Sequence, residues 1–226
     1  MRLHKTSLSI SFLAISALTV PVAFADVIQY GVTVNTSTQN GNYGYIDLQF
    51  NPSSLPTQTA FASVTNFSTD GTLDTFGSDP NDGTIGDVTG TLPGTLSFDN
   101  LTNLNDYTQG ITFGNTISFD LDLSGPAIDT PDPTDFPGGS LFVLDFLNAD
   151  ESGFLFTADP LNDVAAGTVD LNPDGSTTAT AFFSDANDDP SVVTFTGPIS
   201  ASVPEPSTTL PLGIGIIALA VFRFRR

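Results

Sequence analysis

The sequence contains no cysteine and no tryptophan, and its few basic residues avoid the middle of the chain. Without cysteine the protein forms no disulfide, so a folded domain must rely on the burial of apolar side chains. All basic residues and the single histidine lie near the two ends: Arg2, His4, Lys5, Arg223, Arg225 and Arg226. The segment Asp26–Val203 therefore has no Lys, Arg or His.

These absences exclude most catalytic machinery from Asp26–Val203. The segment has no histidine or lysine base, no thiol nucleophile and no Schiff-base amine, and a Ser-His-Asp triad cannot form. Zinc sites built on His or Cys are excluded as well. Nucleic acid is a poor partner because no basic side chain faces its phosphates. We expect no enzyme, with a carboxylate-only glycosidase as the one chemistry that the composition leaves open.

Acidic residues are abundant in the same segment. It holds all of the 25 acidic residues except Glu205, and all of these except Glu151 are aspartates. Such a charge keeps a domain soluble, and it repels anionic lipid and polysaccharide unless divalent cations bridge the charges. Aspartate, glycine and proline favour turns over helices.

The N-terminal residues have the pattern of a signal peptide. Basic residues precede an apolar stretch, Leu8–Val20, and the small residues Ala23 and Ala25 occupy the −3 and −1 positions of a signal peptidase site. The pattern predicts a signal peptide over residues 1–25 and a mature chain that begins at Asp26. The alternative is an uncleaved anchor helix.

The C-terminal residues have three parts. Pro204, Glu205 and Pro206 precede an apolar segment at about 207–222, and Arg223, Arg225 and Arg226 follow. The apolar segment predicts a transmembrane helix, and the terminal arginines favour a cytoplasmic end by the positive-inside rule. The alternative to a sorting signal is an ordinary C-terminal membrane anchor.

The order of these parts over residues 201–226 resembles the sorting signal of PEP-CTERM proteins. The resemblance implies recognition by an exosortase, cleavage near the Pro-Glu-Pro motif and release from the membrane. It also implies a Gram-negative host that makes exopolysaccharide. An acidic, strand-rich domain between the two signals is similar to small cargo proteins of that system, and this similarity implies no particular activity.

Residues 26–200 show the alternation of apolar and polar residues that is typical of half-buried strands. The pattern predicts an all-β domain, a two-sheet antiparallel sandwich that is jelly-roll-like. We expect a bulge between Tyr45 and Ile46, one long strand over Ile111–Leu123 and a linker over 196–206. Further strands are expected over 28–34, 43–50, 59–67, 84–92, 95–98, 141–147, 153–157, 168–171, 177–184 and 191–196, and helical turns over 100–107 and 159–166. The proline-rich segment Gly125–Gly139 reads as an extended loop.

One segment suggests a calcium site. Asp185, Asn187 and Asp189 match the start of an EF-hand loop, but Pro190 replaces the glycine and Thr196 replaces the bidentate glutamate. Looser candidates are Asp79 to Gly83 and the aspartates 129, 132 and 135. The alternative is that all of these are turns with solvated carboxylates. We expect no cofactor other than calcium.

The sequence therefore favours an exported, exosortase-sorted, non-catalytic protein of the envelope or extracellular matrix. The precursor would be anchored in the inner membrane with its domain outside the cytoplasm, and would then reach the outer surface or the matrix. Its partners would be signal peptidase, exosortase and, at its destination, exopolysaccharide. The alternative function is a calcium-assisted carbohydrate-binding module.

Overall fold

The computed structural model describes residues 24–157, 165–184 and 191–204. Within them the chain forms strands and almost no helix. In chain order the strands are β1 (Phe24–Asn35), β2 (Tyr43–Pro52), β3 (Phe61–Thr69), β4 (Thr72–Leu73), β5 (Gly83–Ile85), β6 (Val88–Gly90), β7 (Leu96–Asp99), β8 (Asp106–Thr112), β9 (Thr116–Ser124), β10 (Ser140–Asn148), β11 (Gly167–Leu171), β12 (Thr177–Ala181) and β13 (Val193–Pro204). A 3-10 helix (Ser37–Gln39) and α1 (Pro126–Asp129) are the only helical elements in these residues.

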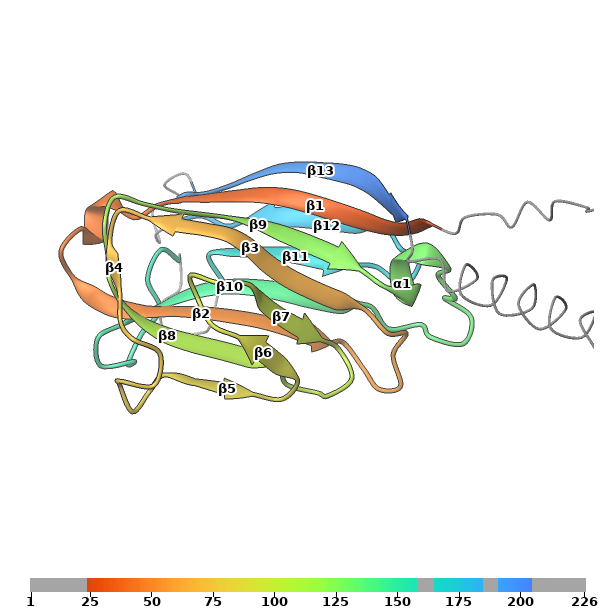
Figure 1. The fold of residues 1–226 in the computed structure, drawn as a ribbon, viewed down its shortest axis with the longest axis horizontal. Coiled ribbons are helices and arrows are strands. Elements are labelled where there is room, and N and C mark those ends of the chain that lie inside the picture. Colours follow the sequence, from red (N-terminus) through yellow and green to blue (C-terminus); the bar gives the residue numbers. More distant parts are fainter. Residues whose placement is uncertain (1–23, 158–164, 185–190, 205–226) are drawn as a thin grey trace, which may run out of the picture. The chain divides into compact units, whose positions relative to one another are not determined.

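The strands form two antiparallel sheets, as the alternation predicts (Figure 1). The β1 sheet has the order β13-β1-β9-β3-β7-β6. The β2 sheet has the order β12-β11-β10-β2-β8-β4, and β5 also pairs with β8. All these strands belong to one compact unit, Phe24–Val203, apart from the last residue of β13.

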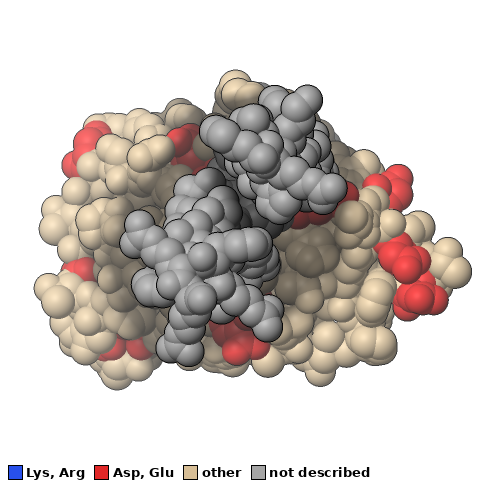
Figure 2. Space-filling model, turned by 45° about the vertical axis from the view of Figure 1, so that its right-hand side comes forward, with Lys and Arg blue, Asp and Glu red and all other residues tan. Residues whose placement is uncertain are grey.

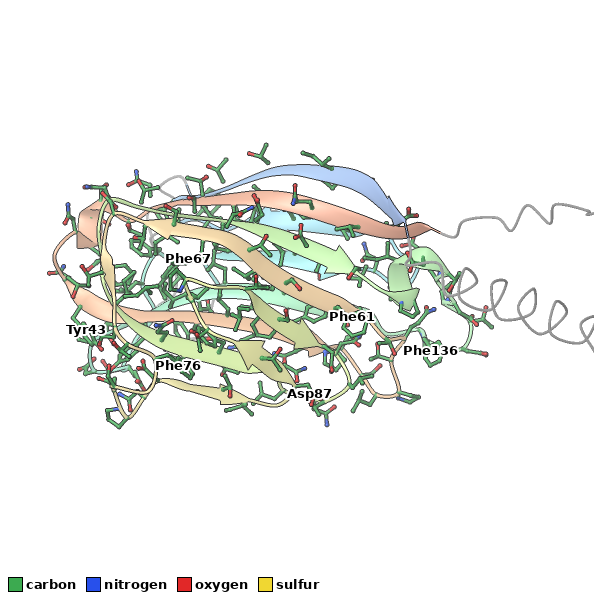
Figure 3. The ribbon with its side chains drawn as sticks, in the orientation of Figure 1. Tyr43, Phe61, Phe67, Phe76, Asp87 and Phe136 are labelled. Carbon is green, nitrogen blue, oxygen red and sulfur yellow. The ribbon has the colours of Figure 1, made fainter. Side chains whose placement is uncertain are left out.

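One hydrophobic core unites apolar side chains from both sheets. Phe98 on β7 and Phe142 on β10 meet edge to face across the core, with ring centroids 6.4 Å apart. The ring centroid of Phe146 lies 6.0 Å from that of Phe113 and 5.3 Å from that of Phe156. Phe67 also points into the interior (Figure 3), where it stacks on Phe119. Because the chain has no disulfide, the stability of the domain depends on burial of this core, to which the aromatic contacts contribute.

The strand expected over Ile111–Leu123 is in fact two strands in different sheets. β8 belongs to the β2 sheet and β9 to the β1 sheet, and the chain turns a corner at Gly114. The inner faces of both sheets point to the same core, so Ile111, Phe113 and Ile117 all remain buried. The alternation continues through the corner, and therefore it did not reveal the corner.

The strand expected over 84–92 also divides. β5 pairs with β8 in the β2 sheet, whereas β6 pairs with β7 in the β1 sheet. Gly86 lies between them with φ +74°, a left-handed conformation that favours glycine and interrupts the strand. Short strands leave too little alternation to show such a switch between sheets.

The bulge expected between Tyr45 and Ile46 is absent. β2 pairs in continuous register with β8 and β10. Tyr45 points away from the core, yet it is only 2% exposed, and its hydroxyl accepts a hydrogen bond from Asn81 Nδ2 at 3.2 Å. The loop that contains Asn81 covers Tyr45 on the outer face of the sheet. Tyr45 is therefore buried without any shift in which residues of β2 face the core.

Other expected elements differ in detail. Residues 100–103 form bends, and the strand β8 begins at Asp106, within the range where a helical turn was expected. Residues 153–157 contribute one isolated bridge, Leu147 to Phe154, and no regular strand. The proline-rich loop contains α1, and β13 continues through the expected linker to Pro204. The segment 159–166 lies mostly outside the described residues.

β1 and β13 lie side by side in the β1 sheet. Gly31 lies beside Thr196, Gly197 lies beside Gln29, and the Asn35 amide donates to the Val192 carbonyl at 2.9 Å. Residue numbers rise along one strand as they fall along the other, so the pair is antiparallel. The start of β1 and the end of β13 therefore lie at the same end of the sheet (Figure 1).

Candidate functional site

Three carboxylates lie on the outer face of the β2 sheet, on three adjacent strands. Asp145 on β10 is the direct cross-strand partner of Asp47 on β2, and Asp106 on β8 is diagonal to Asp47. Asp47 is 7% exposed and Asp145 is 2% exposed. Like charges opposed across two strands repel each other. This carboxylate row, Asp47, Asp106 and Asp145, is the most unusual polar feature of the described fold.

Protonation relieves this repulsion. Burial, followed by the charges of Asp106 and Asp145, raises the pKa of Asp47 to about 8. Burial also raises the pKa of Asp106, although its hydrogen bond with Asp47 acts in the opposite direction. Gln49 Nε2 donates to Asp47 Oδ1 at 3.3 Å, and Thr108 Oγ1 faces Asp106 Oδ1 at 3.4 Å. The pKa values of both Asp47 and Asp106 are therefore raised, which favours their protonated forms.

No basic side chain compensates for the carboxylate row, because Asp26–Val203 contains none. In Figure 2 acidic groups are scattered over the visible face, and no basic group appears among the described residues. No basic side chain of this segment can therefore neutralise Asp47 or Asp106.

A hollow lies beside the carboxylate row on the same sheet face. Its volume is about 340 Å³. Asp145 and Gln49 form part of its wall, and the other described residues that line it are Leu141, Val143, Ala165, Thr168 and Phe182. Apolar walls with a few polar groups are typical of small-molecule sites, and this volume is near the lower end of their range.

A second acidic cluster surrounds two tyrosines near β4 and β5, close to Phe76 in Figure 3. Tyr43 Oη donates to Asp74 Oδ2 at 2.8 Å and lies 3.3 Å from Asp79 Oδ2. Burial and the hydrogen bond to Asp74 raise the pKa of Tyr43 well above its usual value. The backbone amide of Gly110 donates to Asp82 Oδ1 at 2.8 Å. Asp74 and Asp79 thus tie the segment 74–82 to β2, and Asp82 ties it to β8.

The sequence candidates for calcium have different outcomes. Asp185, Asn187 and Asp189 lie outside the described residues. Asp79 and Asp132 accept hydrogen bonds from backbone amides two or three residues ahead, which is the geometry of Asx turns. Among the described residues no group of three or more acidic or histidine side chains is arranged to hold a metal ion.

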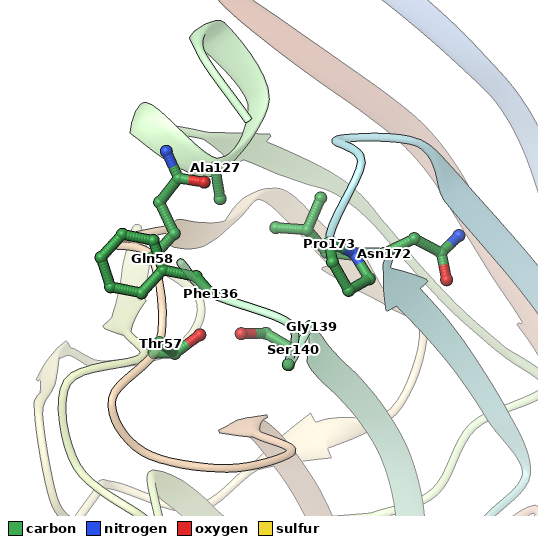
Figure 4. A pocket seen from close by; sticks show the side chains of 10 residues that line it. Thr57, Gln58, Ala127, Phe136, Gly139, Ser140, Asn172 and Pro173 are labelled. Carbon is green, nitrogen blue, oxygen red and sulfur yellow. The ribbon is translucent and has the colours of Figure 1, made fainter. Parts of the chain in front are cut away.

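The hollow beside α1 is much smaller. Its volume is about 10 Å³, which is room for roughly one water molecule. Gln58, Ala127, Phe136, Ser140 and Pro173 are among the side chains around it (Figure 4). It is too small for a sugar ring, so it offers no alternative to the hollow on the β2 sheet.

The predicted processing sites lie at the edge of the described chain. Ala25 and Asp26 belong to β1, and Pro204 is the last residue of β13. Ala23, Glu205, Pro206 and the arginines 223, 225 and 226 lie outside the described residues. Within the part of the chain that the structure describes, no helix is long and apolar enough to cross a membrane.

Sequence reasoning did not single out the carboxylate row. Asp145 interrupts an otherwise apolar strand, and this interruption was the only available signal. Asp47 and Asp106 lie on polar positions of their strands and look like ordinary exposed acids. Pairing of β10, β2 and β8 brings all three together.

No family model, no curated protein and no solved structure matches this chain.

Proposed function

We propose that this chain is an exported, exosortase-sorted and non-catalytic protein of the bacterial envelope or extracellular matrix. A signal peptide over residues 1–25 directs export, and residues 201–226 act as a PEP-CTERM sorting signal. The precursor is held in the inner membrane by its C-terminal helix, with the acidic domain outside the cytoplasm. After processing, the domain reaches the outer surface or the exopolysaccharide matrix.

One structural observation supports the proposal beyond the sequence motifs. The start of β1 and the end of β13 lie at the same end of the β1 sheet. This geometry is compatible with a chain attached to one membrane at both ends, as an exported precursor is before cleavage. The nested neighbours β1–β13, β2–β10 and β3–β9 support a jelly-roll-like description of the domain.

The test is expression of the full chain in a Gram-negative host with and without an exosortase. We expect a processed chain that begins at Asp26. It stays in the membrane fraction without exosortase and leaves it, shortened near Pro204 to Pro206, when exosortase is present. Replacement of the Pro-Glu-Pro motif by three alanines should keep the chain in the membrane. A cytoplasmic chain that retains Met1 would contradict the proposal.

A second candidate function is calcium-assisted carbohydrate binding. The hollow beside Asp145 favours it, because apolar walls with a carboxylate and an amide suit the ring face and hydroxyls of a neutral sugar. A glycan array with and without calcium tests this function. Loss of binding in Phe182→Ala, and retention in Phe183→Ala as the matched exposed control, would support it. No binding on any array would count against it.

A further inference from the structure

The backbone nitrogen of Asp26 faces a carboxylate. It lies 2.7 Å from Asp129 Oδ1, across more than one hundred residues of sequence. Asp129 is the last residue of α1, whose turn is held by the bond from the Asp129 amide to the Gly125 carbonyl at 3.0 Å. Ala127 is buried beneath the same turn. The carboxylate is thus presented by a structure that is packed onto the domain.

Signal peptide removal would change the chemistry of this contact. Hydrolysis adds one water across the Ala25–Asp26 peptide bond, leaves a carboxylate on Ala25 and frees an amine on Asp26. The amine takes up a proton at neutral pH, since an α-amino group has a pKa of about 7.7 to 8.0. An amide donor then becomes a full positive charge at the same atom.

We propose that cleavage before Asp26 creates an ion pair between the new α-ammonium group and Asp129, which fastens the free end of β1 to α1. This inference rests on the signal peptide cleavage proposed above. The ammonium group would be the only cation between Asp26 and Val203, because that segment has no basic side chain. Asp129 therefore has no other cation within that segment to pair with.

The surrounding elements bring no other cation. Asp26 contributes its own carboxylate on β1, and Asp132 and Asp135 follow α1 in its loop. The sequence of β13 contains no charged residue, and β9 offers Asp122, whose Oδ1 accepts from Gln29 Nε2 at 2.8 Å. Negative charge favours the protonated amine, so the pair raises the pKa of the α-amino group.

The sequence permits an unusually clean test. Lys5 is the only lysine and leaves with the signal peptide, so the processed chain has a single amine, that of Asp26. The full chain is exported, purified and acylated at a series of pH values between about 6 and 10. Chymotryptic peptides identify the labelled residue, because trypsin has no site between Asp26 and Val203.

We expect the acylation profile to give a pKa about 0.5 or more above the ordinary range, and added salt to lower it. Asp129→Asn should return it to that range, whereas Asp132→Asn, the matched control in the next loop, should leave most of the elevation. If the Asp26 amine has the same pKa in the parent and in both variants, the ion pair is wrong. Signal peptide cleavage before Asp26 would not be affected by that result. A label on Met1 and Lys5 would overturn both proposals. A chain that has lost its signal peptide but begins at a residue other than Asp26 would overturn the ion pair alone.

Discussion

Asp47 and Asp145 are direct cross-strand partners on β2 and β10, and both are buried on the outer face of the sheet. Two negative charges in this position would repel strongly in a domain without a basic side chain. Burial and the neighbouring charges raise the pKa of Asp47 to about 8, which favours its uncharged form and lessens this repulsion. The stability of the domain is therefore linked to pH.

The first prediction concerns this linkage. Folding raises the pKa of Asp47 from 3.8 to about 8, so the native state binds more protons than the unfolded state between these values. The contribution of Asp47 is fully present below about pH 4 and is lost as the pH rises through 8. We expect the free energy of unfolding in urea to fall by on the order of a few kcal/mol across this window.

Asp47→Asn should flatten this dependence, since the amide cannot ionise. The matched control is Asp87→Asn, which makes the same substitution at an exposed position. It should leave the pH dependence of the unfolding free energy as it is in the parent. Equal slopes in the parent and Asp47→Asn would show that the carboxylate row does not hold the proton.

The second prediction concerns the corner between β8 and β9. A Cβ atom at Gly114 would overlap the Asp70 side chain and the backbone of Gly71. Gly114→Ala should therefore lower the unfolding free energy by about 1–3 kcal/mol, the usual cost of overpacking. Gly83→Ala is the control, because its Cβ meets nothing within 4 Å. If Gly114→Ala leaves the free energy of unfolding in urea unchanged, the residues around Gly114 are packed less tightly than the structure shows.

The third prediction concerns the aromatic cluster of the core. Phe146 is fully buried against Phe113 and Phe156. Phe146→Ala should cost about 3–5 kcal/mol, through lost burial and the cavity that remains. Phe183→Ala removes the same side chain from a position that is 53% exposed and should cost far less. Similar midpoints of thermal unfolding for the two variants would contradict this core.

The fourth prediction concerns the tyrosines. Burial raises the pKa of Tyr107 to about 12, and burial also raises the pKa values of Tyr43 and Tyr45. The chain has four tyrosines and no tryptophan, so the absorbance near 295 nm reports phenolate alone. After a rapid jump to about pH 11 we expect much less phenolate in the folded chain than in urea. A folded chain with full tyrosine ionisation would refute the buried positions.

Some features of the fold were accessible from the sequence. Alternation along 28–34 predicted β1, and the apolar run 141–147 predicted β10 as a central strand. Alternation along 111–123 also predicted the residues of β9, but as part of one longer strand. The partition between sheets was not accessible. The chain passes from one sheet to the other at Gly114 and at Gly86. Alternation does not reveal such a change, because the inner faces of both sheets pack against the same core.

The sequence by itself determined the all-β class, the absence of disulfides and the confinement of basic residues to the ends. Those properties follow from residue type and from local periodicity. The tertiary structure alone decided that Asp47, Asp106 and Asp145 form one row and that Asp26 meets Asp129. Residues far apart in the chain become neighbours only through strand pairing, and their protonation depends on burial that pairing creates.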